Sequence, residues 1–264
     1  MAEPYTLPAE SYHDEIAACC KRLRLSSKLA DRALTEHGSS NQEYLYHLLK
    51  SEIEYRQKTR ITKLMNSAGF PRRYHPDMFR SDEIDFPQGV TFESLLGLDF
   101  YDAGKNVIMY GGTGTGKTML SILIGMSACN KGIAVRFYRT AGLINLFAES
   151  KTNGTLSRLK KKLNAADILI LDEFGYVPYD RAGSELLFDY LSEIHEIKPV
   201  ILNTNLEFSL WVNVLYDQRM TTALIGRLMH HVELILFPGE NNRLRESSIN
   251  AAVENSMSKK GIRP

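Results

Sequence analysis

Residues 111–118 read Gly-Gly-Thr-Gly-Thr-Gly-Lys-Thr and satisfy the pattern G-x-x-x-x-G-K-[ST]. The preceding residues, 106–110, form an apolar run typical of a buried strand, and residues 119–128 form a longer apolar stretch typical of a helix. A strand, a glycine-rich turn and a helix in this order direct backbone amides and the positive end of the helix toward phosphate oxygens. The motif therefore predicts a nucleotide site made of Gly111, Gly112, Thr113, Gly114, Thr115, Gly116, Lys117 and Thr118.

Short apolar runs alternate with helical stretches around this motif. Residues 134–138, 168–171, 200–202 and 232–237 read as further buried strands, and residues 182–195 carry the apolar stripe of a helix. Parallel strands need a crossover connection between them. The alternation therefore predicts an α/β fold with a parallel five-stranded sheet between layers of helices.

The sequence before the motif predicts a different organisation. Ser40 and Glu43 have the spacing of a helix capping box, and leucine and isoleucine follow at helical intervals. Three prolines then favour an extended connector. The predicted boundaries are residues 1–66 for a helical oligomerisation or partner domain, 67–89 for a connector, 90–250 for the nucleotide-binding domain and 251–264 for a flexible polar tail.

Composition places the chain among ordinary globular proteins. It has 264 residues, 32 basic against 31 acidic residues, and 44% apolar residues, which excludes collagen-like and wholly disordered chains. Its amino terminus lacks the pattern of a signal peptide, and its apolar runs are too short to span a membrane. The three cysteines have no metal-ligand spacing. We expect a cytoplasmic protein.

Acidic residues directly follow the third predicted strand. Asp172, at the strand tip, is expected to hold Mg²⁺ together with the hydroxyl of Thr118, while Lys117 bridges the terminal phosphates of ATP. Glu173 is placed to polarise a water molecule for attack on the terminal phosphate. The pair predicts ATP hydrolysis.

Two further positions are candidates for the same reaction. Asn205, after the fourth predicted strand, is expected to hydrogen-bond the attacking water and the terminal phosphate, with Asn203 as the competing position. An arginine supplied by a neighbouring subunit can stabilise the transition state. We favour Arg227 over Arg219, and expect Arg227 to project from the surface toward another protomer.

Basic residues are concentrated between the second and third predicted strands. Residues 139–163 contain six basic residues and one acidic residue, Glu149. Such a concentration of charge suits a phosphate backbone, and without a major-groove recognition helix it predicts binding that is largely independent of DNA sequence. The candidate DNA contacts are Arg139, Lys151, Arg158, Lys160, Lys161 and Lys162, with Arg72, Arg73 and Arg80 as a poorer second group.

From about Leu23 to Glu246 the chain resembles the IstB-type helper ATPases of insertion-sequence transposition, relatives of the DnaC-type helicase loaders. The resemblance rests on the 111–118 motif and on several other segments. These are residues 131–137, 153–156, 171–176, 203–211, 227–231 and 239–246.

This resemblance implies an AAA+ ATPase fold. Because the segment given after Phe237 is short, we expect the fold to be without the helical lid domain that initiator-type relatives append. The resemblance also implies a homo-oligomer with ATP sites at subunit interfaces, assembly on duplex DNA, and partnership with a DDE-type transposase of the IstA type. Arg227 matches the arginine finger of the family, and residues 139–163 match a DNA-contacting helical insertion. Gly226 stands where the family usually has an acidic residue, and Asn203-Thr204-Asn205 where Thr-Ser-Asn is commoner.

Other functions remain open at this point. A DnaC-like helicase loader would use the same core with an amino-terminal domain that grips a replicative helicase. A small-molecule kinase would use the motif but would not need Glu173, Asn205 and Arg227. A non-catalytic scaffold would use ATP only to assemble on DNA.

Overall fold

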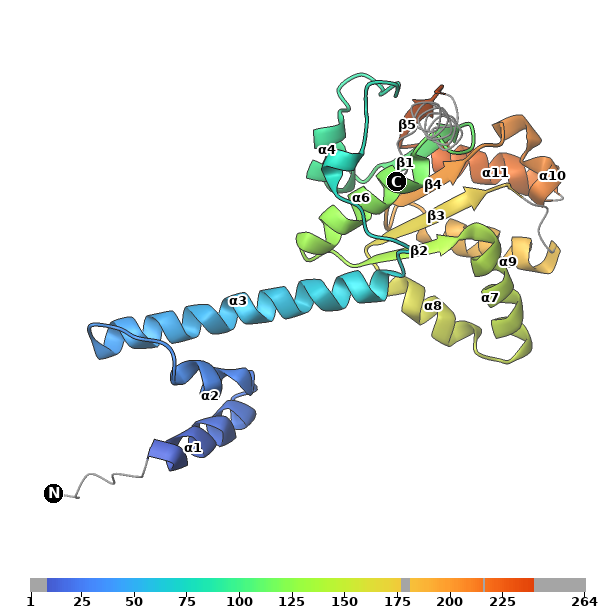
Figure 1. Cartoon of the computed structure of the whole chain (residues 1–264). Helices are drawn as coiled ribbons and strands as arrows, with labels where there is room; N and C mark the ends of the chain where they lie inside the picture. The colour runs from blue at the N-terminus through green and yellow to red at the C-terminus, as the bar shows by residue number, and fades with distance from the viewer. Residues whose placement is uncertain (1–8, 177–180, 216, 240–264) are drawn as a thin grey trace, which may run out of the picture. The chain divides into compact units, whose positions relative to one another are not determined.

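A computed structural model of the chain describes residues 9–176, 181–215 and 217–239 (Figure 1). The chain divides into two compact units, Met1–Lys63 and Leu64–Pro264. The predicted flexible tail at 251–264, and with it the question of a lid, lies outside the described residues.

The first unit is helical, as predicted, and has few buried apolar side chains. It contains α1 (Ala9–Arg22), α2 (Lys28–Ala33) and most of α3 (Asn41–Ala68). At the start of α3 the Ser40 hydroxyl accepts a hydrogen bond from the Glu43 amide at 3.2 Å. The Glu43 carboxylate accepts from the amide of Ser39, at 2.8 Å, and so closes the turn one residue earlier than a capping box would.

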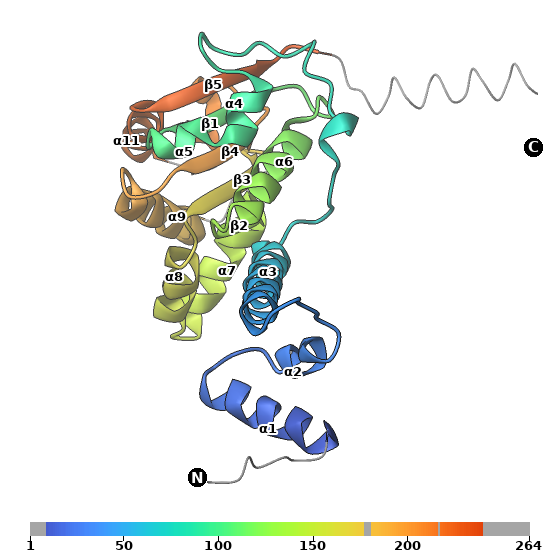
Figure 2. The ribbon, with the colours of Figure 1, turned by 90° about the vertical axis from the view of Figure 1, so that its left-hand side faces the viewer.

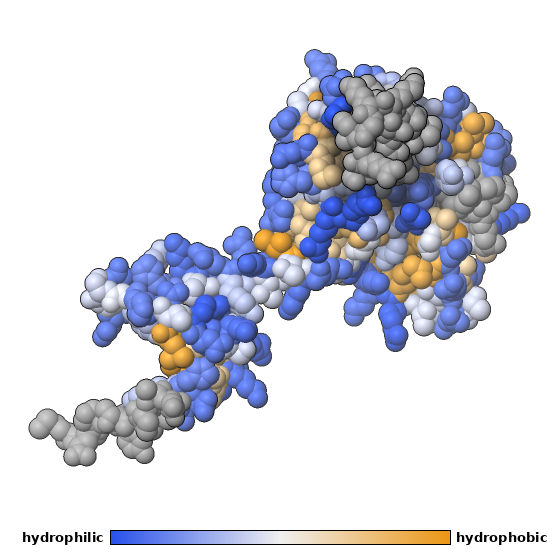
Figure 3. All heavy atoms as spheres, viewed as in Figure 1, coloured by the Kyte–Doolittle hydropathy of each residue, from blue (hydrophilic) through white to orange (hydrophobic). Residues whose placement is uncertain are grey.

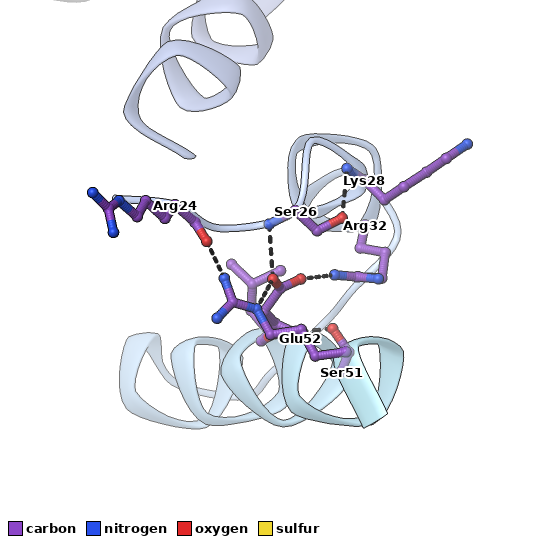
Figure 4. Close-up of polar contacts among 8 residues, drawn as sticks. Arg24, Ser26, Lys28, Arg32, Ser51 and Glu52 are labelled. Atoms are coloured by element: carbon purple, nitrogen blue, oxygen red, sulfur yellow. Dashed lines mark hydrogen bonds and ion pairs between the residues drawn. The ribbon is translucent and has the colours of Figure 1, made fainter. Parts of the chain in front are cut away.

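A buried carboxylate ties the helices of the first unit together (Figure 4). Glu52 of α3 accepts a hydrogen bond from the backbone amide of Ser26 at 2.8 Å and one from Arg56 Nε at 2.8 Å. It also forms an ion pair with Arg32 of α2. Arg56 in turn donates to the carbonyl oxygen of Arg24. Polar contacts therefore supply the link that a larger domain would obtain from apolar packing.

The second unit contains the predicted parallel sheet, which confirms the α/β fold (Figures 1 and 2). All neighbouring strands pair in parallel, in the order β2-β3-β4-β1-β5. The strands are β1 (Asn106–Gly111), β2 (Val135–Arg139), β3 (Ile168–Phe174), β4 (Val200–Thr204) and β5 (Val232–Phe237). The carboxyl ends of β1, β4 and β3 therefore lie side by side, at the edge where open parallel sheets bind ligands.

Helices cover both faces of the sheet, and alternate strand residues enter two separate cores. On one face Val107 and Ile170 pack with α4 (Phe92–Gly97), α5 (Asp99–Asp102) and α6 (Lys117–Asn130). On the other face Ile108 and Leu169 pack with helices from the later part of the chain. These are α7 (Thr140–Thr152), α8 (Leu156–Asn164), α9 (Arg181–Ile194), α10 (Val212–Leu215) and α11 (Gln218–Met229).

The segment expected as a connector, residues 67–89, packs against the sheet unit. It includes a short 3₁₀ helix, η1 (Pro76–Met78); a second, η2 (Phe208–Leu210), follows β4. Asp85 pairs with Leu236 through two backbone hydrogen bonds of 2.9 and 3.0 Å. The segment thus adds an antiparallel bridge to β5, which would otherwise present a free sheet edge.

Within the described ranges, no helix combines the length and the apolar character that crossing a membrane requires.

Candidate nucleotide-binding site

The glycine-rich loop leaves the carboxyl end of β1 and enters α6. Gly111 lies so close to β5 that an added Cβ would come within 2.2 Å of the carbonyl oxygen of Phe237, so only glycine fits there. Gly116, immediately before α6, has φ +106°, a backbone conformation that favours glycine. These two constraints fix the path of the loop and place the amino terminus of α6 beside it.

Lys117 is buried, with 9% of its surface exposed. Its ammonium group donates to the carbonyl oxygen of Gly111 at 2.7 Å, to that of Gly112, and to the hydroxyl of Thr115 at 3.3 Å. Burial lowers the pKa of Lys117 to about 8, although the nearby Asp172 carboxylate opposes the shift. The loop therefore holds a lysine whose charge is poorly balanced by its own surroundings.

The loop and the acidic end of β3 are joined by direct contacts. The Thr118 hydroxyl lies 2.9 and 3.0 Å from the two carboxylate oxygens of Asp172. Asn203, at the end of β4, donates from Nδ2 to Asp172 at 2.8 Å and to the Ser121 hydroxyl at 2.9 Å. The structure thus brings three strand ends together at Asp172, which is 3% exposed.

Glu173 lies on the opposite side of β3 from Asp172. The register of β3 and β4 shifts between Leu171 and Phe174, and Glu173 adopts φ +57°, which is rare for a side chain other than glycine. Its side chain is 47% exposed, and Oε2 lies 3.5 Å from Arg139 Nε. The bulge therefore separates two adjacent acids, one directed into the loop and one outward.

Buried hydroxyl groups hold this bulge in place. Thr140 donates to the carbonyl oxygen of Asp172 at 2.9 Å, and Thr204 donates to that of Phe174 at 2.9 Å. Sequence reasoning did not single out Thr140 or Ser121. A signal existed for Ser121, because it is a polar residue within the apolar stretch at 119–128, four residues after Lys117.

The two asparagines after β4 occupy different environments. Asn203 is 1% exposed and contacts Asp172, whereas Asn205 is exposed in the bend that follows the strand. Asn203 Oδ1 is buried without a hydrogen-bond partner in the part of the chain that the structure describes. Asn205, the predicted contact to the terminal phosphate, thus lies exposed just after β4. Asn203, the competing position, lies in the buried hydrogen-bond network around Asp172.

Arg227 does not project from the surface as expected. It is half-buried in the last turn of α11, and its guanidinium carbon lies 5.4 Å from the centre of the Phe188 ring on α9. Its Nη1 is buried and unpartnered among the described residues. Arg219, in the first turn of the same helix, is exposed.

The predicted DNA contacts fall into two groups. Arg139 lies at the end of β2 beside β3 and pairs with Glu173, as described above. The other five lie on α7 and α8. Lys160 pairs with Glu193, whereas Lys151, Arg158, Lys161 and Lys162 are exposed. Helix α8 buries Leu159 and Leu163, so its basic residues form the outward face.

A parallel sheet with a P-loop after β1, and an acid at the end of β3 that meets the loop threonine, defines a P-loop nucleotide-binding protein of the α/β class. The particular family follows from sequence comparison. Residues 21–250 match the IstB-like ATP binding proteins, and the chain belongs to this family.

Individual relatives match most of the chain. The ATP-binding protein of insertion sequence IS5376 from Geobacillus stearothermophilus is 31% identical, over 89% of this chain and 96% of that protein. That of insertion sequence IS21 from Pseudomonas aeruginosa is 32% identical, over 77% of each chain. Among solved structures, the crystal structure of the DnaC helicase loader is 17% identical with a TM-score of 0.44, over 78% of this chain and 95% of that one.

Proposed function

We propose that this chain hydrolyses ATP while assembled on duplex DNA and so assists a DDE-type transposase of the IstA type. The observation that carries the proposal is the contact between Thr118 and Asp172, because it joins the phosphate loop to an acid where a hydrolytic site needs its Mg²⁺. The names of the insertion-sequence relatives support the link to transposition.

The donor atoms around Asp172 suit Mg²⁺, which prefers oxygen ligands. Thr118 offers a hydroxyl and Asp172 a carboxylate, and the unpartnered Asn203 Oδ1 adds an oxygen nearby. We infer that Thr118 and Asp172 hold the ion and that Asn203 orients Asp172. When bound, the ion neutralises charge on the β- and γ-phosphates of ATP.

Phosphate binding and activation of the attacking water are assigned to side chains and backbone amides of this chain. The amides of residues 111–118 and the Lys117 ammonium bind the phosphates. The half-exposed Glu173 carboxylate orients a water molecule and accepts its proton as the water oxygen bonds to the γ-phosphorus and the bond to the β-phosphate oxygen breaks. Asn205 is the proposed contact to the γ-phosphate from the end of β4.

Arg227 is proposed to act on the ATP of a neighbouring protomer. Its cation–π contact with Phe188 means that the guanidinium must turn away from α9 to do so, whereas exposed Arg219 needs no such change. Mixing two inactive variants tests the assignment. Arg227→Ala and Lys117→Ala proteins should regain hydrolysis when combined if Arg227 acts across an interface, and Arg219→Ala serves as the matched alternative.

DNA contact is proposed for the outward basic faces of α7 and α8. Replacing Lys151, Arg158, Lys161 and Lys162 by alanine should weaken binding to unrelated duplexes to a similar extent. It should also reduce the slope of log K against log salt by about 0.9 for each phosphate that the variant no longer neutralises. Arg181→Ala is the control, because Arg181 is exposed on the same unit and already pairs with Glu185.

The main test compares Glu173→Gln with Lys117→Ala. Glu173→Gln should keep ATP and DNA binding while turnover falls by about 10² to 10⁴-fold, since a positioned base contributes that much. Lys117→Ala should lose ATP binding and, with it, ATP-dependent assembly. Unchanged turnover in Glu173→Gln would overturn the catalytic assignment.

A further inference from the structure

Two histidines and a glutamate meet at the edge of the sheet opposite the phosphate loop. His195 and Glu196 follow the end of α9, and His230 follows the end of α11. Because both helices run back along parallel strands, their carboxyl ends lie near the amino ends of the strands. No part of the proposed ATP site is used here.

The three side chains are spaced like the ligands of one metal ion. His195 Nε2 lies 3.8 Å and His230 Nδ1 lies 3.6 Å from Glu196 Oε1, and the three atoms are all within 4.8 Å of one another. In a tetrahedral zinc site with bonds of about 2.0–2.1 Å, ligand atoms lie about 3.3 Å apart. Small side-chain rotations would close the observed gaps.

The chemistry of the donors favours a transition metal. Two imidazoles and one carboxylate form a recurrent zinc donor set that leaves a fourth position for water or an outside ligand. Mg²⁺ and Ca²⁺ prefer sets made of oxygen alone. The side chain of His195 is 25% exposed, and those of Glu196 and His230 are about 60% exposed, so an ion can enter from solvent.

The backbone at Glu196 adds an independent observation. Glu196 has φ +61°, in the turn that follows α9, where glycine would be the unstrained residue. Its carboxylate is nevertheless placed between the two imidazoles, within 4 Å of each. A glutamate at this position therefore has a conformational cost that contact with a bound cation would offset.

The neighbouring cation is held away from the cluster. Lys198 donates to the carbonyl oxygens of Leu163 and Ala166, at 2.9 Å each. His195, Glu196 and Lys198, together with His231, Asp102 and Asp167, line a cavity of about 480 Å³. Two of the three candidate ligands, His195 and Glu196, thus lie in the wall of an open cavity with room for a fourth ligand.

We propose that His195, Glu196 and His230 bind one divalent transition-metal ion, Zn²⁺ in preference to Mg²⁺, which links the carboxyl end of α9 to that of α11. His230 lies three residues after Arg227, so the ion would also restrict the turn that carries Arg227. The site itself does not depend on ATP hydrolysis or on DNA binding.

The test uses the full chain, freed of metal with a chelator and titrated with Zn²⁺ alone, without nucleotide. We expect calorimetry to give one ion per chain, and Co²⁺ to give the visible absorption of a tetrahedral site. His195→Ala and His230→Ala should each weaken Zn²⁺ binding by at least about tenfold, since losing even a supporting partner of a ligand costs that much. The titrations use a Cys19→Ser background, because Cys19 is an exposed thiol.

His75→Ala is the matched control. His75 lies 3.0 Å from Asp77 in another exposed pair, but within the described residues that pair has no third ligand. Zn²⁺ binding that is equally tight in His230→Ala and His75→Ala would overturn the proposal, as would the absence of stoichiometric binding by the parent chain.

Glu196→Gly distinguishes a metal ligand from a structural residue. Because glycine accepts the positive φ, this variant should unfold at a temperature equal to or higher than that of the parent chain when no metal is present. It should also bind Zn²⁺ at least about tenfold more weakly, by the same argument as for the histidines. An unchanged Zn²⁺ affinity in Glu196→Gly would remove Glu196 from the site.

Discussion

Among the described residues, each of the two units contains one deeply buried carboxylate, and the two carboxylates are partnered in opposite ways. Glu52 in the helical unit and Asp172 in the sheet unit are both 3% exposed. Glu52 forms ion pairs with Arg32 and Arg56. Asp172 receives hydrogen bonds from the neutral groups of Thr118 and Asn203, and among the described residues no cation lies within ion-pairing distance of it.

The difference separates a structural carboxylate from one prepared for a ligand. A buried charge that is paired directly with arginines gains nothing from a further cation. Asp172 has only neutral direct partners and is attracted to Lys117 without forming an ion pair with it, so its charge remains under-compensated. The unpartnered Asn203 Oδ1 adds negative potential at the same point. Mg²⁺ would supply the positive charge that the Asp172 site lacks. In the helical unit, Arg32 and Arg56 already supply positive charge to Glu52.

The helical unit also exposes several large apolar side chains. Figure 3 shows apolar side chains among hydrophilic ones on this unit, and the exposed residues include Leu23, Leu34, Leu45, Leu49 and Ile53. Among its described residues, the buried apolar ones are Cys20, Leu29 and Ala30, so the unit depends on the Glu52 contacts more than a larger domain would. The helical unit is thus stabilised more by polar contacts, and the sheet unit more by buried apolar side chains.

The largest expected effect comes from Asp172→Asn. Removal of the uncompensated charge should lower Mg²⁺-dependent ATP hydrolysis by about 100-fold or more, the upper range seen even for residues that only support a metal ligand. The same change should leave the thermal midpoint unchanged or raise it, because a buried carboxylate without a cation is costly. Steady-state hydrolysis and calorimetric unfolding of the variant check both parts. A large loss of stability would mean that Asp172 is structural, as Glu52 is.

The second effect is on stability alone. Glu52→Gln should destabilise the helical unit by about 2 kcal/mol, less than the 3–5 kcal/mol for breaking a fully buried pair, because Arg56 is half exposed and Arg32 one-fifth exposed. Hydrogen exchange of amides in α2 and in the middle of α3 measures this change. ATP hydrolysis per folded chain should be unaffected.

Glu43→Gln is the control for this variant. Glu43 lies on the same helix but is exposed and contacts Ser39 and His47. Its replacement should change stability much less than Glu52→Gln does, because solvent screens an exposed carboxylate. Equal effects of the two substitutions would show that Glu52 is no more important than a surface carboxylate.

The fold could be predicted from sequence because apolar runs report burial on both faces of a parallel sheet. All five expected strands are present, and the helix expected at 182–195 is α9, Arg181–Ile194. The glycine motif likewise specifies a local backbone path, since Gly111 and Gly116 are needed for steric reasons. Such signals are local in sequence, which is why they can be read without a structure.

Contacts between distant residues could not be predicted in the same way. Nothing near Glu52 in the sequence indicates that Arg32 and Ser26 reach it, and the contact of Asn203 with Asp172 depends on β4 lying beside β3. The packing of Arg227 on Phe188 likewise joins two helices. The bulge that gives Glu173 a positive φ is a property of strand register, and the sequence carries no pattern for it.

A third effect concerns Lys117, the cation of the under-compensated site. Because burial lowers its pKa to about 8, Lys117 is charged below that pH and loses its charge as the pH rises above it. ATP binding needs the charged form. The dissociation constant should therefore be nearly constant below about pH 7.5 and rise by up to about tenfold for each pH unit above about 8.

Calorimetry of ATP binding across this range, in two buffers of different ionisation enthalpy, measures both the affinity and the proton taken up. Lys117→Arg is the control, because a guanidinium stays charged throughout and its affinity, whatever its absolute value, should not show this rise. If the affinity of the wild-type chain for ATP did not change up to about pH 9.5, the Lys117 ammonium would keep its charge despite burial. The phosphate loop would then not be under-compensated.

The smallest effect tests the other carboxylate. Burial alone would raise the pKa of Glu52, but hydrogen bonds from the Ser26 amide, Arg56 and Arg32 outweigh it and lower the pKa below the ordinary value of 4.5. A lowered carboxylate pKa contributes stability that is present above the unfolded value and is lost as the pH falls through the folded value. The free energy of unfolding of the helical unit should therefore fall on acidification by no more than the protonation of one carboxylate can account for.

Exchange of the Ser26 amide, measured between about pH 3 and pH 6 and corrected for intrinsic rates, follows this loss directly. The Glu52→Gln variant should show no corresponding pH dependence, because it has no proton to gain at that position. If the wild type and the variant weakened in parallel, other carboxylates would govern the acid response, and Glu52 could not be the balanced counterpart of Asp172.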